Sequence, residues 1–397
     1  MIAATTPDRS NDTDICVSIG IIAWNEEEVI EAALESLWQQ TLFSEIGRRG
    51  LRAEIICIAN GCSDRTAAIA RRFFERIKTD AVADSVHGRV VEVSERGKNN
   101  SWNLFVHSLS ASHAAALFLM DADIVIQGEE TLWNMFGALE ESSLASVAVD
   151  EPLKDIALNP RKSISERISV ATSGMTRMGR AQMSGQLYCI RAGIARQIFL
   201  PRDLAACEDG FIKALVCTDF LTSNICPDRV VQAKKAAHIF QSYRTLSDVL
   251  RNQKRQMIGQ TIVHILIDKY LKELPVSERL DMANAIRARE CSDRDWLKRL
   301  IAQHLRDIRF FWRLFPNLLR FRYERWRALP LRRRISHLPS AFTGYVVTLL
   351  ASHMAFRFLK QGSINYWPDT RSPGLKDFVP SPASERLMTT PITLNQR

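Results

Sequence analysis

The sequence has few of the glycine motifs on which several large nucleotide-binding classes depend. Glycine accounts for 17 of 397 residues, and neither G-x-G-x-x-G nor G-x-x-x-x-G-K-[ST] occurs. This argues against dinucleotide oxidoreductases and P-loop kinases, because both need those glycines where backbone approaches phosphate. The turn after the first apolar segment, AWNEEE, contains no glycine at all. That excludes the glycine-rich phosphate loop with which sugar nucleotidyltransferases open.

Cysteine is present but lacks the spacing of a metal or disulfide motif. The eight cysteines include no C-x-x-C pair, and no H-x-x-x-H accompanies them. The first fifteen residues also lack the charged and apolar regions of a secretory signal. We therefore expect free thiols and an amino-terminal part in the reducing cytosol.

Positive charge is concentrated near the C-terminus. The chain carries a net charge of +9, and residues 301–337 hold ten arginines against two acids, a net charge of +8. Aromatic residues interleave with these arginines. The mixture suits an anionic lipid surface better than nucleic acid, so we expect a membrane surface and no nucleic acid as partner.

The next segment, residues 338–356, contains no Asp, Glu, Lys or Arg. Nineteen helical residues at about 1.5 Å each could cross a bilayer. Polar residues such as Thr348, Ser352 and His353 dilute the apolar character. We expect an interfacial or packed helix, with a single transmembrane span as the alternative.

Strand-like and helix-like segments alternate over the first 243 residues. Apolar runs such as CVSIGIIAW and EIICIAN predict buried strands, and the segments that follow them have helical spacing. The alternation predicts an α/β fold with a mostly parallel sheet flanked by helices. We expect a catalytic and nucleotide-binding domain at 15–243, a helical basic region at 244–360 and a loosely ordered tail at 361–397.

Polar residues follow each predicted strand, where ligands collect in such sheets. Asp121 and Asp123 come directly after the apolar run AAALFLM. Two carboxylates one residue apart can hold a hard divalent cation, which neutralises a diphosphate. A solvated turn or a helix cap has the same pattern, so the pair alone does not establish a metal site.

Several blocks in order resemble glycosyltransferase family 2, the GT-A-type inverting transferases. The blocks are AWNEE (23–27), NGCSDRT (60–66), GKNNSWN (97–103) and MDAD (120–123). The family more often has Asp where this chain has Asn60. The resemblance covers about residues 15–260.

The resemblance implies a nucleotide-sugar donor and a divalent metal, Mg²⁺ or Mn²⁺. Carried over residue by residue, it implies nucleotide-binding roles for Ala23, Asn25, Glu27, Asn60, Asp64, Lys98 and Asp121. It implies a metal site at Asp121 and Asp123, with His238 as a ligand or, alternatively, as a structural histidine. Asp64 could instead be a plain helix cap, and Lys98 a solvated loop charge.

The acceptor side is implied by shorter blocks. Gly185 precedes a strand that ends in Arg191, and Glu208-Asp209 resembles the family's E-D block, in which Asp209 matches the catalytic base. An acidic helix start is the alternative for Asp209. Arg255 matches the Arg of the Q-x-x-R-W motif, but Gln256 stands where processive members have Trp. We therefore expect transfer of one sugar or a few.

The resemblance implies an inverting transferase of the hexosyl or N-acetylhexosaminyl type. We expect it to move a sugar from a UDP-sugar to a hydroxyl of a glycan or lipid-linked acceptor, at the cytoplasmic face of a membrane. The alternative is a decayed nucleotide-sugar-binding or scaffold protein at a membrane. The fold hosts many acceptors, so the sequence leaves the substrates open.

Overall fold

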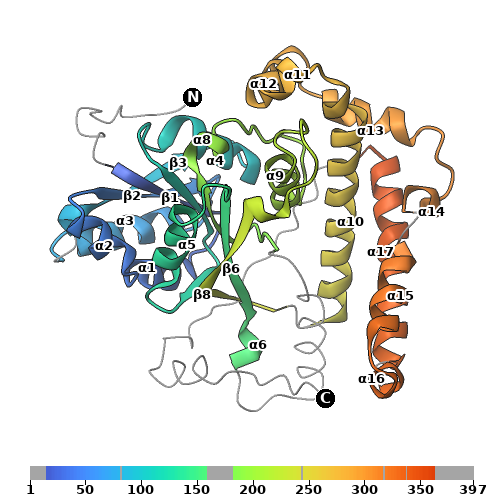
Figure 1. Ribbon diagram of the computed structural model, residues 1–397, viewed down its shortest axis with the longest axis horizontal. Coiled ribbons are helices and arrows are strands. Elements are labelled where there is room, and N and C mark those ends of the chain that lie inside the picture. Colours follow the sequence, from blue (N-terminus) through green and yellow to red (C-terminus); the bar gives the residue numbers. More distant parts are fainter. Residues whose placement is uncertain are drawn as a thin grey trace.

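The computed structural model describes residues 15–80, 83–158, 182–242, 245–315, 318–336 and 338–362. Its centre is a mixed eight-stranded sheet in the order β3-β2-β1-β4-β7-β6-β8-β5 (Figure 1). The strands are β1 (Ile15–Ala23), β2 (Arg52–Asn60), β3 (Val86–Val93), β4 (Ala116–Asp121), β5 (Ile124–Gln127), β6 (Val147–Lys154), β7 (Leu187–Arg191) and β8 (Val230–Phe240).

The amino-terminal half of the sheet is parallel. β1 pairs in parallel with β2 and β4, and β2 pairs in parallel with β3. β7 then runs antiparallel to β4. The predicted α/β class, with a mostly parallel sheet and a helical C-terminal region, is confirmed.

One face of the sheet is covered by helices from the first half of the chain. These are α1 (Ile30–Trp38), α2 (Leu42–Arg48), α3 (Thr66–Ile77) and α5 (Thr131–Glu140). In α3, apolar residues at positions 67, 70, 73, 74 and 77 recur at three- and four-residue steps, and all are buried. Those at 70, 73, 74 and 77 belong to one buried core together with odd-numbered residues of β1.

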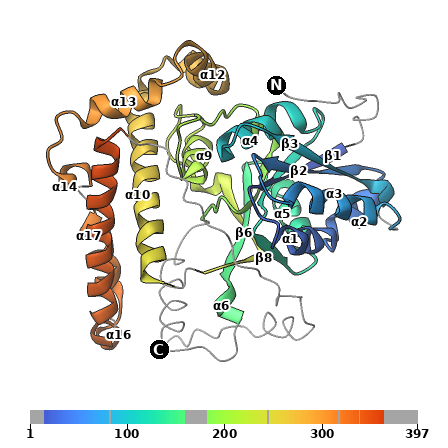
Figure 2. The ribbon, with the colours of Figure 1, turned by 180° about the vertical axis from the view of Figure 1, so that it is seen from behind.

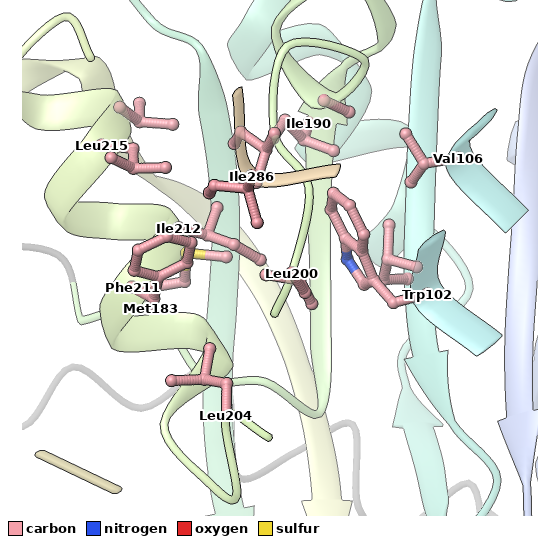
Figure 3. Close-up of a cluster of buried hydrophobic side chains, with 14 of the residues drawn as sticks. Trp102, Val106, Met183, Ile190, Leu200, Leu204, Phe211, Ile212, Leu215 and Ile286 are labelled. Carbon is pink, nitrogen blue, oxygen red and sulfur yellow. The ribbon is translucent and has the colours of Figure 1, made fainter. Parts of the chain in front are cut away.

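The other face is covered by α4 (Lys98–Leu104), a π-helical turn (Phe105–Leu109) and α9 (Glu208–Cys217). Figure 3 shows Trp102 and Val106 on one side of this second core and Phe211, Ile212 and Leu215 of α9 on the other. The Trp102 indole donates to the Tyr188 hydroxyl at 2.7 Å, which satisfies both buried polar groups. Short helical segments elsewhere are η2 (Ala83–Ser85), α6 (Asp155–Leu158), α8 (Ala192–Ala195) and η4 (Pro227–Arg229).

A helical region follows β8. It comprises α10 (Leu246–Lys269), η5 (Leu271–Glu273), α11 (Val276–Arg279), α12 (Met282–Ser292), α13 (Trp296–Leu305), α14 (Phe311–Leu314), α15 (Leu318–Ala328), α16 (Leu331–Ser336) and α17 (Leu338–Lys360). Both views show α10 standing between the sheet side of the molecule and α17 (Figures 1 and 2).

The helical region shares a core with the sheet. Ile258 and Ile262 of α10 and Ile286 of α12 belong to the same buried cluster as Phe211 of α9. The division near residues 243 and 244 therefore stays a prediction, since the two parts are packed as one hydrophobic unit. The predicted tail lies outside the described residues from position 363 onward.

Candidate active site

The parallel strands bring four polar loops to one edge of the sheet. Ala23 at the end of β1 pairs with Ala59, and Ile22 pairs with Asp121. Asn60 of β2 pairs with Val93 of β3. The loops after β1, β2, β3 and β4 therefore emerge side by side, as expected for a ligand site at the carboxyl ends of parallel strands.

The first two loops are locked together by side chains that accept hydrogen bonds from backbone. Asn25 Oδ1 accepts from Ser63 N at 2.8 Å, and Asp64 Oδ2 accepts from Glu27 N at 3.1 Å. Asp64 Oδ1 also accepts from Thr66 N at 3.0 Å, so Asp64 both joins the two loops and pairs with the first backbone N–H of α3. Asn25 has a φ of 55°, a conformation that this fixed loop can maintain.

The third loop is tied to the second. Asn60 Oδ1 accepts from Gly97 N at 2.9 Å, which places Lys98 at the start of α4. Glu27 is held differently, because its Oε2 accepts from the backbone and side chain of Arg65 at 3.1 and 3.0 Å. That hydrogen bonding lowers the pKa of Glu27.

Lys98 joins the predicted donor and acceptor sides. Its Nζ lies 2.7 Å from Asp121 Oδ1 and 2.9 Å from Glu208 Oε1, and it donates to the Gly185 carbonyl at 3.2 Å. The Lys98 side chain is 13% exposed. A Cβ at Gly185 would lie 2.9 Å from Glu208 Oε1, so a larger residue there would displace the carboxylate that pairs with Lys98. Lys98 is therefore the electrostatic centre of the site.

The acids nonetheless outnumber the cation. Burial and the nearby charges of Asp123, Asp121 and Asp64 raise the pKa of Glu26 to about 9. Burial likewise raises the pKa of Asp121 to about 7, with Lys98 opposing it and Asp123 adding to it. Both shifts reflect several acids crowded at this edge of the sheet, so a bound cation would favour their ionised forms.

The side chains present suit a hard divalent cation. Asp121 and Asp123 offer carboxylate oxygens, the ligands that Mg²⁺ and Mn²⁺ favour. Within the described ranges, no group of three or more His, Cys, Asp or Glu side chains could hold a metal by itself. Two carboxylates completed by substrate phosphates are the usual arrangement for Mg²⁺, so the donor set fits.

Asp209 lies in the first turn of α9, beside this cluster. Cys207 before it is left-handed, with φ 64° and ψ 35°. Burial and the neighbouring Glu208 raise the pKa of Asp209 to about 6. For Glu208, burial opposes ionisation, but Lys98, a backbone hydrogen bond and Arg255 together lower the pKa. Glu208 therefore stays ionised as the partner of Lys98, and Asp209 titrates near neutrality as a general base requires.

Comparison with known families shows what this chain is similar to. Residues 18–195 match the family model Glycosyl transferase family 2. The family resemblance is confirmed. A comparison with curated proteins gives no match.

Several solved structures are similar to this chain at low sequence identity. The mannosyltransferase PcManGT from Pyrobaculum calidifontis, in complex with GDP-Man and Mn2+, has a TM-score of 0.51 at 14% identity, covering 90% of this chain and 89% of that one. S. aureus TarS 1-349 has a TM-score of 0.41 at 14% identity, covering 89% of this chain and 93% of that one. Glucosyl-3-phosphoglycerate synthase from Mycobacterium tuberculosis has a TM-score of 0.40 at 14% identity, covering 66% of this chain and 81% of that one. At 14% identity, the likeness to PcManGT shows a shared fold alone.

Outside the family 2 match, α10 packs against the chain just before Asp209. A Cβ at Gly259 would lie 2.6 Å from the Ala206 carbonyl oxygen. Cys207 Sγ donates to Gln256 Oε1 at 3.2 Å. Gln256 therefore holds the loop that leads into α9, at the position where processive members carry the Trp of Q-x-x-R-W. Arg255 lies within electrostatic reach, since its charge helps to lower the pKa of Glu208.

Arg191 requires a correction, because it does not lie on the acceptor side. β7 runs antiparallel to β4, so Arg191 pairs with Ala116 at the start of β4, away from Asp121. Its guanidinium donates to three backbone carbonyls, those of Leu139, Ser142 and Ala145. Arg191 fixes a loop at the other end of the sheet.

His238 is fully buried on β8. Its Nδ1 lies 2.7 Å from Asp150 Oδ2, and its Nε2 lies 3.3 Å from Gln186 Oε1. The backbone carbonyl of Gln186 in turn accepts from Asp121 N at 2.8 Å. Since both ring nitrogens have partners in this conformation, ligation by His238 would require Gln186 to move. Its metal role stays a prediction.

One feature of the site, the pairing of Arg96 with Trp24, was missed by the sequence reasoning. The Arg96 guanidinium lies over the Trp24 ring, 3.3 Å from its centroid. This pair borders a cavity of about 470 Å³ that extends from Asn60 past Lys98 to Glu208. The signal was available for Arg96, which stands two residues before Lys98 in the same polar loop.

Proposed function

We propose that the protein is a metal-dependent inverting glycosyltransferase that takes its sugar from a nucleoside diphosphate donor. The observation that carries this is the Lys98 bridge. The buried ammonium of Lys98 pairs with Asp121, on the predicted donor side, and with Glu208, which precedes the candidate base Asp209.

Different residues along the sheet edge would bind different parts of the donor. Asp121 and Asp123 would hold the divalent cation, which when bound neutralises the diphosphate leaving group. Asn25, Asn60 and Asp64, fixed by their backbone hydrogen bonds, form a rigid rim for the base and ribose beside Ala23. A rim already fixed before binding loses little freedom when the donor arrives.

Asp209 performs the proton transfer in a single displacement. The acceptor hydroxyl oxygen forms a bond to the anomeric carbon while the bond from that carbon to the diphosphate oxygen breaks. The hydroxyl proton passes to the Asp209 carboxylate, so the anomeric configuration inverts. A carboxylate whose pKa is about 6 is ionised at neutral pH and still basic enough to assist.

We propose a UDP-sugar of the hexosyl or N-acetylhexosaminyl type as donor and a glycan or lipid-linked hydroxyl as acceptor, at the cytoplasmic face of a membrane. The missing aromatic at Gln256 favours short transfers. PcManGT is described with GDP-Man and Mn2+, so GDP-mannose is the first competitor in the donor test.

The test is release of nucleoside diphosphate from a panel of UDP- and GDP-sugars with Mn²⁺, with and without membrane lipid extract. We expect acceptor-stimulated release from one donor, abolished by Asp123→Ala. Donor binding with no turnover by any extract would instead favour the scaffold alternative. Activity of the Asp123→Ala variant equal to wild type would overturn the metal assignment.

A further inference from the structure

Helix α17 has two unlike faces. One face, buried against α10, contains Val347, Thr348, Ala351, Ser352, Ala355, Phe356 and Leu359. The other face is apolar and exposed. Its large side chains, here called the outer stripe, are Phe342 (69% exposed), Val346 (39%), Leu349 (38%), Leu350 (50%) and Met354 (40%). Steps of three and four residues place them along one side of the helix.

The packing of α17 argues against a transmembrane span. Residues 341–360 form the one helix, within the described part of the chain, that is long and apolar enough to cross, with a mean hydropathy of 1.2 and 39% of that window buried. Its buried face includes two polar residues, and Thr348 Oγ1 donates to Gln253 Oε1 of α10 at 3.3 Å. Spanning would require α17 to leave α10 and expose these groups to lipid. The outer stripe can meet lipid while that packing stays intact.

The exposed apolar surface continues beyond α17. Of the 16 exposed large hydrophobic residues in the described chain, 11 lie between positions 310 and 354. They include Phe310 and Trp312, whose rings stack at 4.5 Å, and Leu331 and Ile335 of α16. Helices α14, α15 and α16 all contact α17, and Figures 1 and 2 show this group on the far side of α10 from the sheet. Such a concentration marks an interaction surface.

The charge of this region identifies the partner. Exposed arginines border the apolar side chains, among them Arg309, Arg313, Arg327 and Arg332. Arginine can extend its stem along apolar surface while its guanidinium reaches a phosphate. A second copy of the chain would bring a like-charged surface, whereas an anionic phospholipid layer offers both opposite charge and apolar depth.

We propose that α14 to α17 form an in-plane docking surface for an anionic bilayer, with the outer stripe inserted among the headgroups and α10 kept on the protein side. The surface places the protein on a membrane without any span. This deepens the proposed function by naming the lipid surface where the acceptor is met. Vesicle binding needs no donor, so the docking test is independent of transfer activity.

The experiment is flotation of the full chain with phosphatidylglycerol-containing vesicles and with pure phosphatidylcholine vesicles, at low and high salt. We expect binding to the anionic vesicles alone, reversed by alkaline extraction. Phe342→Ser with Leu350→Ser should weaken partition by about tenfold or more, because two apolar side chains lose their insertion. Arg313, Arg327 and Arg332 replaced by Gln should weaken it about 100-fold at low salt.

The matched control is Leu144→Ser with Ile225→Ser, which removes two apolar side chains of similar exposure, 48% and 73%, outside this surface. The control should bind vesicles like wild type. Equal effects of the control and stripe variants, or no binding to anionic vesicles, would overturn the proposal. Resistance to alkaline extraction would show a span instead. A stripe variant that changes only the oligomeric state would assign the surface to a second copy.

Discussion

Replacing Lys98 with methionine is expected to destabilise the protein while leaving the shape of its side-chain stem in place. The ammonium lies 2.7 Å from Asp121 Oδ1 and 2.9 Å from Glu208 Oε1, in a site where all three side chains are largely buried. Removing one partner from a buried pair costs about 3–5 kcal/mol, because the remaining charge is left uncompensated. We expect a loss of that size in chemical unfolding.

The loss should depend on pH in a defined direction. Without Lys98, the pKa of Asp121, already about 7 in wild type, rises further in the folded state, and the pKa of Glu208 rises above its unfolded value. The folded protein then binds more protons than the unfolded chain, so its stability falls as pH rises through this range. Wild type also gains stability when the pH is lowered from about 8 to about 6, but the variant should gain more, because its two carboxyl pKa values lie higher. Mn²⁺ should also restore part of it.

The control is Lys272→Met. Lys272 Nζ lies 2.7 Å from Asp268 Oδ1, but the Lys272 side chain is 55% exposed, so its loss should cost less than about 1 kcal/mol. If Lys98→Met costs no more than this control, or if its loss of stability is the same at both pH values, the Lys98 bridge is not the electrostatic centre of the site.

Three further predictions concern the base and its support. Asp209→Asn should lower turnover by about 10²- to 10⁴-fold with donor affinity nearly unchanged; equal losses of both would make Asp209 a binding residue. In wild type, kcat/KM should rise with pH near about 6, as the Asp209 carboxyl loses its proton. A pH profile that is flat across this range would show that Asp209 is not the base. Gly259→Ala should lower kcat and the unfolding midpoint, because a Cβ there would lie 2.6 Å from the Ala206 carbonyl, whereas Gly137→Ala, with nothing within 4 Å, should be neutral or slightly stabilising. Identical behaviour of the two glycine variants would show that α10 does not position the start of α9.

Local periodicity was sufficient to predict the sheet and the loops that line the site. The runs now seen as β1, β2 and β4 are apolar on both faces and end in polar residues, so parallel pairing brings Asn25, Asn60 and Asp121 to one edge. The bridge from Lys98 to Glu208 could not be predicted from spacing, because it joins residues 110 positions apart through the turn at Gly185.

Strand direction explains the prediction that was wrong. The pattern LYCIR predicts a strand but not whether it runs with or against its neighbour, and the antiparallel pairing of β7 carries Arg191 to the opposite end. The contact of α10 with Ala206 could not be predicted either, since packing between segments distant in the sequence leaves no local pattern. Glu26 shows the converse case: its motif was recognised, but its raised pKa depends on burial and on Asp123, Asp121 and Asp64, which the fold brings close to it.

The most direct test of the central claim is calorimetric titration of wild type and Asp123→Ala with UDP and with GDP, each with and without Mn²⁺. A metal-dependent nucleotide-sugar glycosyltransferase should bind one of the two nucleotides only when Mn²⁺ is present, and Asp123→Ala should abolish that binding. Nucleotide binding that is independent of Mn²⁺, or equal in both proteins, would contradict the claim that Asp121 and Asp123 hold the cation of the donor.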